Sequence, residues 1–233
     1  IALGLDNAMH LAACLGVESI MIPSFEPEDI PKLVLKHKPN LFLCGPIHCL
    51  EMINSNLLSD KDLSFLELVV AGGDKMPKDL QEKFQLFLKS HNSKADAWIG
   101  YGATETSAGN ACNNDDCFKI ESVGIPYLKN NASIFDLETN EEVCGYNKIG
   151  ELRISGPTLM HSYFPNSINE LNDAIKEDEN GIRWYASGDL AHFDEDGNLY
   201  IDGRIKRIIT RRGFKIYPNH VEQLILEHPD IAQ

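Results

Sequence analysis

The stretch from Ile99 to Glu105 combines chemically different groups directly after an apolar run. It reads Ile-Gly-Tyr-Gly-Ala-Thr-Glu. Tyr101 offers an aromatic face, and Gly102 lets a ligand approach the backbone closely. Thr104 offers a hydroxyl that can bind a phosphate, and the carboxylate of Glu105 is a ligand that Mg²⁺ accepts. The set could hold a flat ring, a phosphate and a metal ion, although an ordinary turn could contain the same residues.

A second candidate turn follows the apolar run at residues 69–71. Gly72, Gly73 and Asp74 come directly after this run, and two glycines would let a flat ligand lie against the backbone. Ligands of parallel sheets bind beyond the carboxyl ends of the strands, so both turns are candidate binding segments. Taken alone, these residues favour the simpler interpretation, which is a plain connection between a strand and a helix.

Residues 184–222 alternate short apolar runs with turns that contain glycine. Ser187-Gly188-Asp189 is expected to end one turn, and residues 194–198 are expected to form a polar turn between two short strands. Gly203-Arg204 closes the second strand. A plain hairpin with acidic turns and a basic edge would explain the glycines. It would not explain why a single Asp and a single Arg stand at matched strand ends.

The elements that must position these residues alternate through the first half of the chain. Apolar runs predict buried strands, and the segments between them predict helices. The expected strands are 19–22, 41–44, 66–71 and 97–101, and the expected helices are 2–16, 27–38, 46–54 and 77–90. Nearly continuous apolar strands that alternate with helices indicate a parallel sheet covered by helices on both faces.

After about Val123 the pattern changes, because helices become rare and turns become frequent. Residues 132–137 and 150–155 predict antiparallel strands, 167–177 a short helix, and 218–228 a helix with Pro near its start. The predicted fold class is therefore α/β. A layered α/β unit with a mostly parallel sheet precedes a small antiparallel β unit and the start of a small C-terminal domain. The predicted divisions are 1–122, 123–205 and 206–233.

The charge balance narrows the classes of partner. The 233 residues carry a net charge of −14, which argues against nucleic acid and against an anionic membrane surface. No apolar run approaches the ~20 residues of a membrane span, and the start shows no signal peptide, so we expect a cytoplasmic protein. The chain begins with Ile1 in the middle of a pattern, and we interpret it as a piece of a longer protein.

The six cysteines do not form a C-x-x-C pair. Cys44 and Cys49, like Cys112 and Cys117, are spaced too widely for the usual zinc knuckle. Free thiols in a reducing cytoplasm are expected. A metal-binding loop from Cys112 to Cys117 is the alternative.

The order of these motifs resembles the adenylate-forming enzymes, which are also called acyl-activating or AMP-binding enzymes. This superfamily includes acyl-CoA synthetases, beetle luciferases and peptide-synthetase adenylation domains. One motif would be a weak signal, but the ordered series is specific. The matching residues are Tyr101-Gly102-Ala103-Thr104-Glu105, Gly124 and Pro126, Gly150-Glu151-Leu152, Gly156-Pro157, Ser187-Gly188-Asp189, Asp194 and Gly197, Gly203-Arg204, Gly213, Lys215, Pro218 and Glu222. Ser187 replaces the commoner Thr, which keeps the hydroxyl.

The resemblance implies a role for each candidate residue. Tyr101 would pack on adenine, and Asp189 would accept both ribose hydroxyls. Arg204 would bind ribose or phosphate oxygens through its planar donor fork, and Lys206 lies where the family hinges its small domain. The implied catalytic residues are Thr104, Glu105 and Arg204, with Glu105 as the Mg²⁺ ligand. The implied cofactor-binding residues are Gly72, Gly73, Asp74, Tyr101, Gly102, Asp189, Arg204 and Lys206.

The resemblance also implies an activity for the parent protein, most like that of an acyl-CoA synthetase. A carboxylic acid would be activated with ATP as an acyl-adenylate and transferred to CoA, with Mg²⁺ as the metal. The family's phosphate loop and the lysine of its small domain are not in this chain, so the isolated chain is expected to be inactive. The alternatives are a peptide-synthetase-type adenylation domain and a non-catalytic fragment that binds nucleotide. We expect Tyr101 and Asp189 to face one cleft.

Overall fold

The computed structural model describes residues 3–163, 174–211, 214–218, 221, 222 and 225. The chain divides into two compact units, residues 1–127 and residues 128–233. We call them the N-terminal unit and the C-terminal unit and describe each by itself. The division predicted from the sequence, with boundaries near residues 122 and 205, stays a prediction.

The N-terminal unit is built on a five-stranded sheet with the order β1-β2-β3-β4-β5. The first three strands run parallel, with Leu41 opposite Leu68 and Val69 opposite Ala97, and β4 and β5 continue the sheet in antiparallel pairing. This confirms the predicted layered α/β unit. The strands are β1 (Leu41–Cys44), β2 (Leu68–Ala71), β3 (Ala97–Ala103), β4 (Ala108–Cys112) and β5 (Ile125–Pro126).

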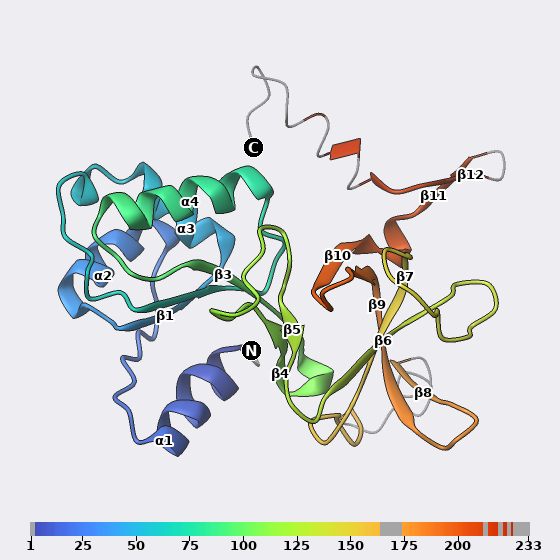
Figure 1. The fold of residues 1–233 in the computed structure, drawn as a ribbon. Coiled ribbons are helices and arrows are strands. Elements are labelled where there is room, and N and C mark those ends of the chain that lie inside the picture. The colour runs from blue at the N-terminus through green and yellow to red at the C-terminus, as the bar shows by residue number, and fades with distance from the viewer. Residues whose placement is uncertain (1–2, 164–173, 212–213, 219–220, 223–224, 226–233) are drawn as a thin grey trace. The chain divides into compact units, whose positions relative to one another are not determined.

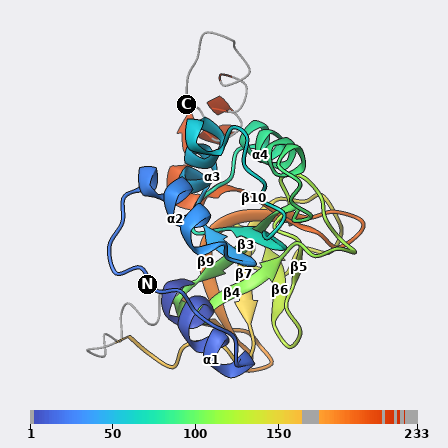
Figure 2. The same cartoon turned by 90° about the vertical axis from the view of Figure 1, so that its left-hand side faces the viewer.

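Three helices cover one face of the parallel strands (Figures 1 and 2). They are α2 (Ile30–His37), α3 (Pro46–Asn54) and α4 (Lys78–Ser90). Helix α4 buries Leu80, Phe84 and Leu88, which lie one helical turn apart on the same face. Burial of each such side chain contributes about 1.5–3 kcal/mol. The buried Gln81 on this helix donates to the carbonyl of Ala97 at 2.9 Å, so it ties α4 to β3.

The first 22 residues differ in part from the prediction. A π-helical segment, Leu3–His10, leads into α1 (Leu11–Leu15) on the other side of the sheet (Figures 1 and 2). Gly16 ends it in the left-handed conformation with φ of 67°, as a glycine stop requires. The strand predicted at residues 19–22 is wrong. Ile20 and Met21 are exposed, and the Ser19 hydroxyl donates to the Ala8 carbonyl of the preceding helix instead of joining a ladder.

The C-terminal unit is an antiparallel sheet with the order β10-β9-β7-β6, to which β8 adds beside β9. A separate hairpin joins β11 and β12. The predicted antiparallel unit is confirmed. The strands are β6 (Asn131–Phe135), β7 (Gly150–Ser155), β8 (Ile175–Glu177), β9 (Arg183–Phe193), β10 (Leu199–Arg204), β11 (Ile209–Arg211) and β12 (Phe214–Ile216).

The helix predicted at residues 167–177 is wrong at its C-terminal end, where Ile175–Glu177 pairs with β9 as β8. The acidic turn explains the strand. Asp178 accepts from the backbone N–H groups of Asn180 and Ile182 and from the indole of Trp184 at 3.0 Å, and these bonds fold β8 back onto β9. Residues 167–173 and most of the helix predicted from Pro218 lie outside the described residues.

Two general properties of the chain complete the fold. All six cysteines are free thiols. In the part of the chain that the structure describes, no helix is long and apolar enough to cross a membrane.

Gly124 gives a test of the fold, because its φ is +75° and a Cβ at this position would lie 2.0 Å from the Cys112 carbonyl oxygen. We expect Gly124→Ala to lower the free energy of unfolding by about 2–5 kcal/mol, through left-handed strain and overpacking. Urea unfolding followed by circular dichroism measures this. Gly4→Ala is the control, because Gly4 is helical and its Cβ would meet nothing within 4 Å. Equal midpoints for the two variants would contradict the prediction.

Candidate functional site

Glycines occupy the first position after β1 and the first two positions after β2, at the carboxyl edge of the parallel strands. A Cβ at Gly72 would lie 3.2 Å from the Gly100 carbonyl oxygen, and a Cβ at Gly45 would lie 3.8 Å from the Gly72 carbonyl oxygen. The residue that follows β1 therefore lies beside the residue that follows β2, and the latter lies beside the middle of β3. Gly73 and Asp74 are exposed at this edge. A flat ligand can approach the backbone here, as the glycines of the second candidate turn indicated.

Tyr101 lies inside β3, in agreement with the strand predicted at residues 97–101, and the strand continues through Gly102 and Ala103, where the sequence indicated a turn. Strand β3 runs on through Ala103 because β4 pairs with it, with Tyr101 opposite Ala111 and Gly102 opposite Gly109. A Cβ at Gly102 would lie 1.6 Å from the Ala108 carbonyl oxygen. The hairpin itself therefore requires glycine at this position. That requirement does not depend on a ligand, and the cofactor-binding role of Gly102 stays a prediction.

Thr104 and Glu105 begin a 3₁₀ turn, Thr104–Thr106, that connects β3 to β4. Thr104 is exposed and Glu105 is half-buried. Two side chains that the sequence analysis missed hold this turn. The fully buried Thr106 donates to the Ala103 carbonyl at 3.2 Å, and Asn110 donates to the Thr106 hydroxyl at 2.5 Å. The sequence could have indicated Asn110, because a lone Asn within Ala-Gly-Asn-Ala-Cys needs a hydrogen-bond partner when the strand is buried.

Ser187-Gly188-Asp189 forms a bulge in the middle of β9, where the sequence analysis expected the end of a turn. Ala186 pairs with Arg153 and Leu190 with Glu151, so residues 187–189 stand opposite Leu152 alone. Gly188 takes a φ of +70°, which glycine adopts without strain. Bulges of this kind redirect a side chain within a continuous strand.

Asp189 and Arg204 form a direct cross-strand pair. They are register partners of β9 and β10, and Arg204 Nε lies 2.7 Å from Asp189 Oδ1. The Asp189 side chain is 7% exposed, whereas that of Arg204 is 64% exposed. A carboxylate buried to this degree needs a charged or hydrogen-bonding partner. The two residues predicted to hold one nucleotide therefore contact each other.

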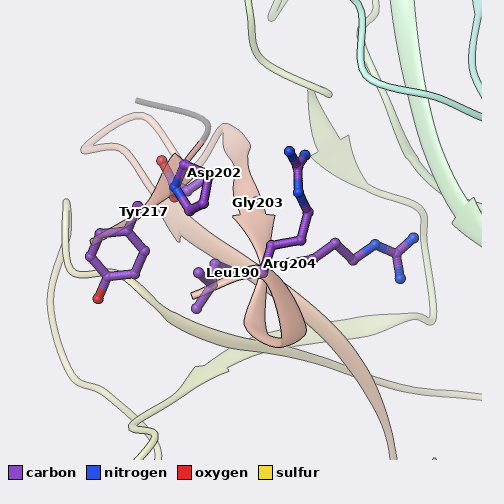
Figure 3. A pocket seen from close by; sticks show the side chains of 7 residues that line it. Leu190, Asp202, Gly203, Arg204 and Tyr217 are labelled. Atoms are coloured by element: carbon purple, nitrogen blue, oxygen red, sulfur yellow. The ribbon is translucent and has the colours of Figure 1, made fainter. Parts of the chain in front are cut away.

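A depression lies around the end of β10 in the C-terminal unit (Figure 3). Figure 3 shows Arg204 and Tyr217 on different sides of Leu190. The depression is lined by Leu190, Asp202, Gly203, Arg204, Arg207, Tyr217 and Pro218. The predicted hinge residue, Lys206, is exposed in the 3₁₀ turn Ile205–Arg207 beside it. Gly213 lies outside the described residues, and Lys215 lies in β12.

A second acid–base pair lies next to Arg204. Asp202 is the extra residue of a bulge in β10, because Ile201 pairs with Ala191 and Gly203 with Leu190. His192 Nδ1 lies 2.7 Å from Asp202 Oδ2, and its ring stacks on Tyr200 with centroids 5.0 Å apart. The hydrogen bond to Asp202 raises the pKa of His192, and this outweighs the lowering by burial. The sequence analysis missed this pair, because nothing in the sequence beyond the two residue types indicated that they would meet.

The residues present fit a magnesium ion that is shared with a substrate. Within the described residues, no group of three or more His, Cys, Asp or Glu side chains could hold a metal ion. Mg²⁺ is commonly bound through one or two carboxylates together with substrate phosphates. The half-exposed Glu105 suits that arrangement. The cleft predicted to contain both Tyr101 and Asp189 joins residues of two units, and it stays a prediction.

The architecture by itself defines a class of protein. A parallel α/β layer with glycine turns at its carboxyl edge belongs to the class of α/β folds in which ligands bind beyond the carboxyl ends of the strands, and here an antiparallel β unit follows it in the chain. The sequence profile of the AMP-binding enzyme family matches residues 1–164. The chain therefore belongs to the AMP-binding enzyme family, as the resemblance in the sequence indicated.

Relatives agree with this membership, and a solved structure shares the fold. A long-chain-fatty-acid–CoA ligase of Bacillus subtilis is 32% identical over 99% of this chain, and a 4-coumarate–CoA ligase of Pinus taeda is 29% identical over 98%. The chain spans 39% and 42% of these two relatives, less than half of their length. The fold is similar to that of ATP-bound MatB from Rhodopseudomonas palustris, with a TM-score of 0.85 at 23% identity, covering 100% of this chain and 44% of that protein.

The pair of His192 and Asp202 predicts a pH dependence of stability. The folded state raises the pKa of His192. The pair therefore stabilises the fold at pH values below the pKa of His192 in the unfolded chain, near 6.5. This stabilisation is lost as the pH rises through the pKa of His192 in the folded state. Asp202→Asn removes the charged partner. We expect wild type to exceed Asp202→Asn in unfolding free energy by on the order of 1 kcal/mol at pH 6, and by less at pH 9.

Urea unfolding at both pH values measures this difference. Glu195→Gln in the neighbouring exposed turn is the control, and it should show no such change between pH 6 and pH 9. A constant difference between wild type and Asp202→Asn would contradict the assignment.

Proposed function

We propose that this chain is part of an enzyme that activates a carboxylic acid with ATP and transfers the acyl group to CoA. The proposal is carried by the family match over residues 1–164, which includes the segment from Tyr101 to Glu105. The activity, its substrates and its partners belong to the whole protein, because the chain spans less than half of its relatives.

The N-terminal unit would hold the base and the phosphates. The half-buried Tyr101 offers an aromatic face beside the glycine edge, where Gly72, Gly73 and Asp74 would line the adenine. In the first step the acid carboxylate attacks the α-phosphate and pyrophosphate leaves, so negative charge gathers on phosphate oxygens. The Thr104 hydroxyl would donate to these oxygens. Bound Mg²⁺ would neutralise part of this charge, and Glu105 would hold the ion.

The C-terminal unit would hold the ribose. A carboxylate can accept hydrogen bonds from two hydroxyls at once, and Asp189 is already fixed on one side by Arg204 Nε. Arg204 is mostly exposed, so its guanidinium remains within reach of ribose or phosphate oxygens. Lys206 would serve at the hinge of a small domain that moves between the two half-reactions.

The choice of CoA as acceptor rests on the names of the relatives. The enzymes of Bacillus subtilis and Pinus taeda are both CoA ligases, one for long-chain fatty acids and one for 4-coumarate. Their substrates differ widely, so the acid is not specified.

The test is acid-dependent exchange of pyrophosphate with ATP by the full-length protein, screened over a panel of fatty and aromatic acids. We expect exchange with at least one acid, and formation of its CoA thioester when CoA is added, detected by mass spectrometry. Adenylate without thioester would instead favour a peptide-synthetase-type domain. AMP binding without exchange by folded protein would favour a non-catalytic nucleotide-binding protein and would overturn the proposal.

Glu105 gives a sharper prediction in the same assay. Glu105→Gln should lower the rate of adenylation by ~10²–10³, because a charged group that supports the transition state is lost. The loss should be partly offset by raised Mg²⁺ concentration. Glu82→Gln on the exposed face of α4 is the matched control and should exchange at the wild-type rate. A Glu105→Gln variant with wild-type exchange would remove Glu105 from the metal site.

A further inference from the structure

The bulge in β9 leaves one position of β7 without its regular hydrogen-bond partner on β9. Leu152 stands opposite residues 187–189, where the regular ladder between the two strands is interrupted. Leu152 is fully buried in this sheet. A buried carbonyl without a donor costs about 1–3 kcal/mol, so the bulge needs another group to take the place of the missing ladder bond.

The side chain of Ser187 is that group. Its hydroxyl donates to the Leu152 carbonyl at 2.6 Å. The same oxygen accepts from the backbone N–H of Asp189 at 3.0 Å. Ser187 is itself buried, with 7% exposure. One hydroxyl thus bridges β7 to the residue that carries the carboxylate, and it spans the gap that the three-residue bulge opens.

These two bonds fix the backbone on the N-terminal side of Asp189. The positive φ of Gly188 turns the chain between Ser187 and Asp189, and a Cβ at Gly188 would meet nothing within 4 Å. Crowding by neighbouring atoms therefore does not set this conformation. Beyond the bulge, Leu190 pairs again with Glu151, and Arg204 holds the Asp189 carboxylate from β10.

We infer that Ser187 is a positioning residue, whose hydroxyl holds the β9 bulge in the shape that aims the Asp189 carboxylate at the two hydroxyls of a ribose. This inference rests on the proposed function, in which Asp189 binds the ribose. Ser187 does not touch the ligand. Its effect on binding passes through the backbone of Asp189 and is therefore specific for the part of the nucleotide that Asp189 contacts.

The experiment compares the affinities of the full-length protein for ATP and for 2′,3′-dideoxy-ATP, which lacks both ribose hydroxyls. Isothermal titration calorimetry measures both dissociation constants. Wild type should prefer ATP, and Asp189→Ala should lose the preference. Ser187→Ala should weaken ATP binding about tenfold while changing dideoxy-ATP binding by less than about twofold. Ser187→Thr keeps the hydroxyl and should keep the preference.

Ser122→Ala is the matched control. Ser122 is fully buried, and its hydroxyl also accepts from the backbone N–H two residues later, that of Gly124, at 2.8 Å. Its removal should lower the melting temperature and leave the preference for ATP unchanged. A purely structural role of Ser187 would give the same result for Ser187→Ala, with a lower melting temperature and an unchanged preference, and would overturn the inference.

Two further outcomes are distinguishable. If wild type binds both nucleotides equally, or neither, the proposed ribose site fails and the inference fails with it. If wild type and Asp189→Ala differ as expected but Ser187→Ala keeps the preference, the proposed function stands and only the inference fails. Should Ser187→Ala not fold, Ser187→Cys replaces the hydroxyl with a weaker donor. It should lower the preference several-fold, and an unchanged preference would overturn the inference.

Discussion

A buried carboxylate needs a charged or hydrogen-bonding partner, and in this chain that constraint shapes the middle of the C-terminal sheet. Asp189 is nearly inaccessible, and Arg204 lies directly opposite it on β10 at 2.7 Å. Removing Arg204 would leave the charge of the buried Asp189 uncompensated, which destabilises the fold. The pairing also fixes β10 against β9 immediately before the turn Ile205–Arg207. The segment that follows Arg204 therefore starts from a defined position.

Two bulges frame this ion pair, one on each strand. The bulge of β9 contains Asp189. The bulge of β10 contains Asp202, whose carboxylate is hydrogen-bonded to His192. The carboxylate of each of these two pairs, that of Asp189 and that of Asp202, lies where the regular alternation of its strand is broken. Bulges redirect side chains at the expense of ladder bonds. Local side chains then make up the loss, as the Ser187 hydroxyl does for the Leu152 carbonyl.

The N-terminal unit meets a different constraint, because its candidate ligand edge has to be free of side chains and still be rigid. The glycines supply the space, and contacts behind the edge supply the rigidity. Gly102 cannot carry a Cβ because the Ala108 carbonyl oxygen occupies that place. Thr106 and Asn110 then hold the turn that carries Thr104 and Glu105. A motif that looks like a ligand loop in sequence is thus largely a hairpin with its own structural requirements.

The sequence by itself determined the fold class and the identity of the motif residues. Alternation of apolar runs with helices predicted β1, β2, β3 and the three covering helices, because the period of each element is a local property. The ordered motifs indicated the AMP-binding family, and the profile match confirmed it. Only the tertiary structure decided that Ile20 and Met21 are exposed, since an apolar segment becomes a strand only beside a partner.

Only the tertiary structure, too, decided how the motif residues are held. Gly102 and Ala103 extend β3 because β4 pairs with them, and Ser187-Gly188-Asp189 is a bulge because β7 and β10 fix the strand on both sides. Register across a sheet depends on residues far apart in the chain, such as Asp189 and Arg204. A linear pattern names these two residues, but the hydrogen bonds between strands set the distance and direction between them.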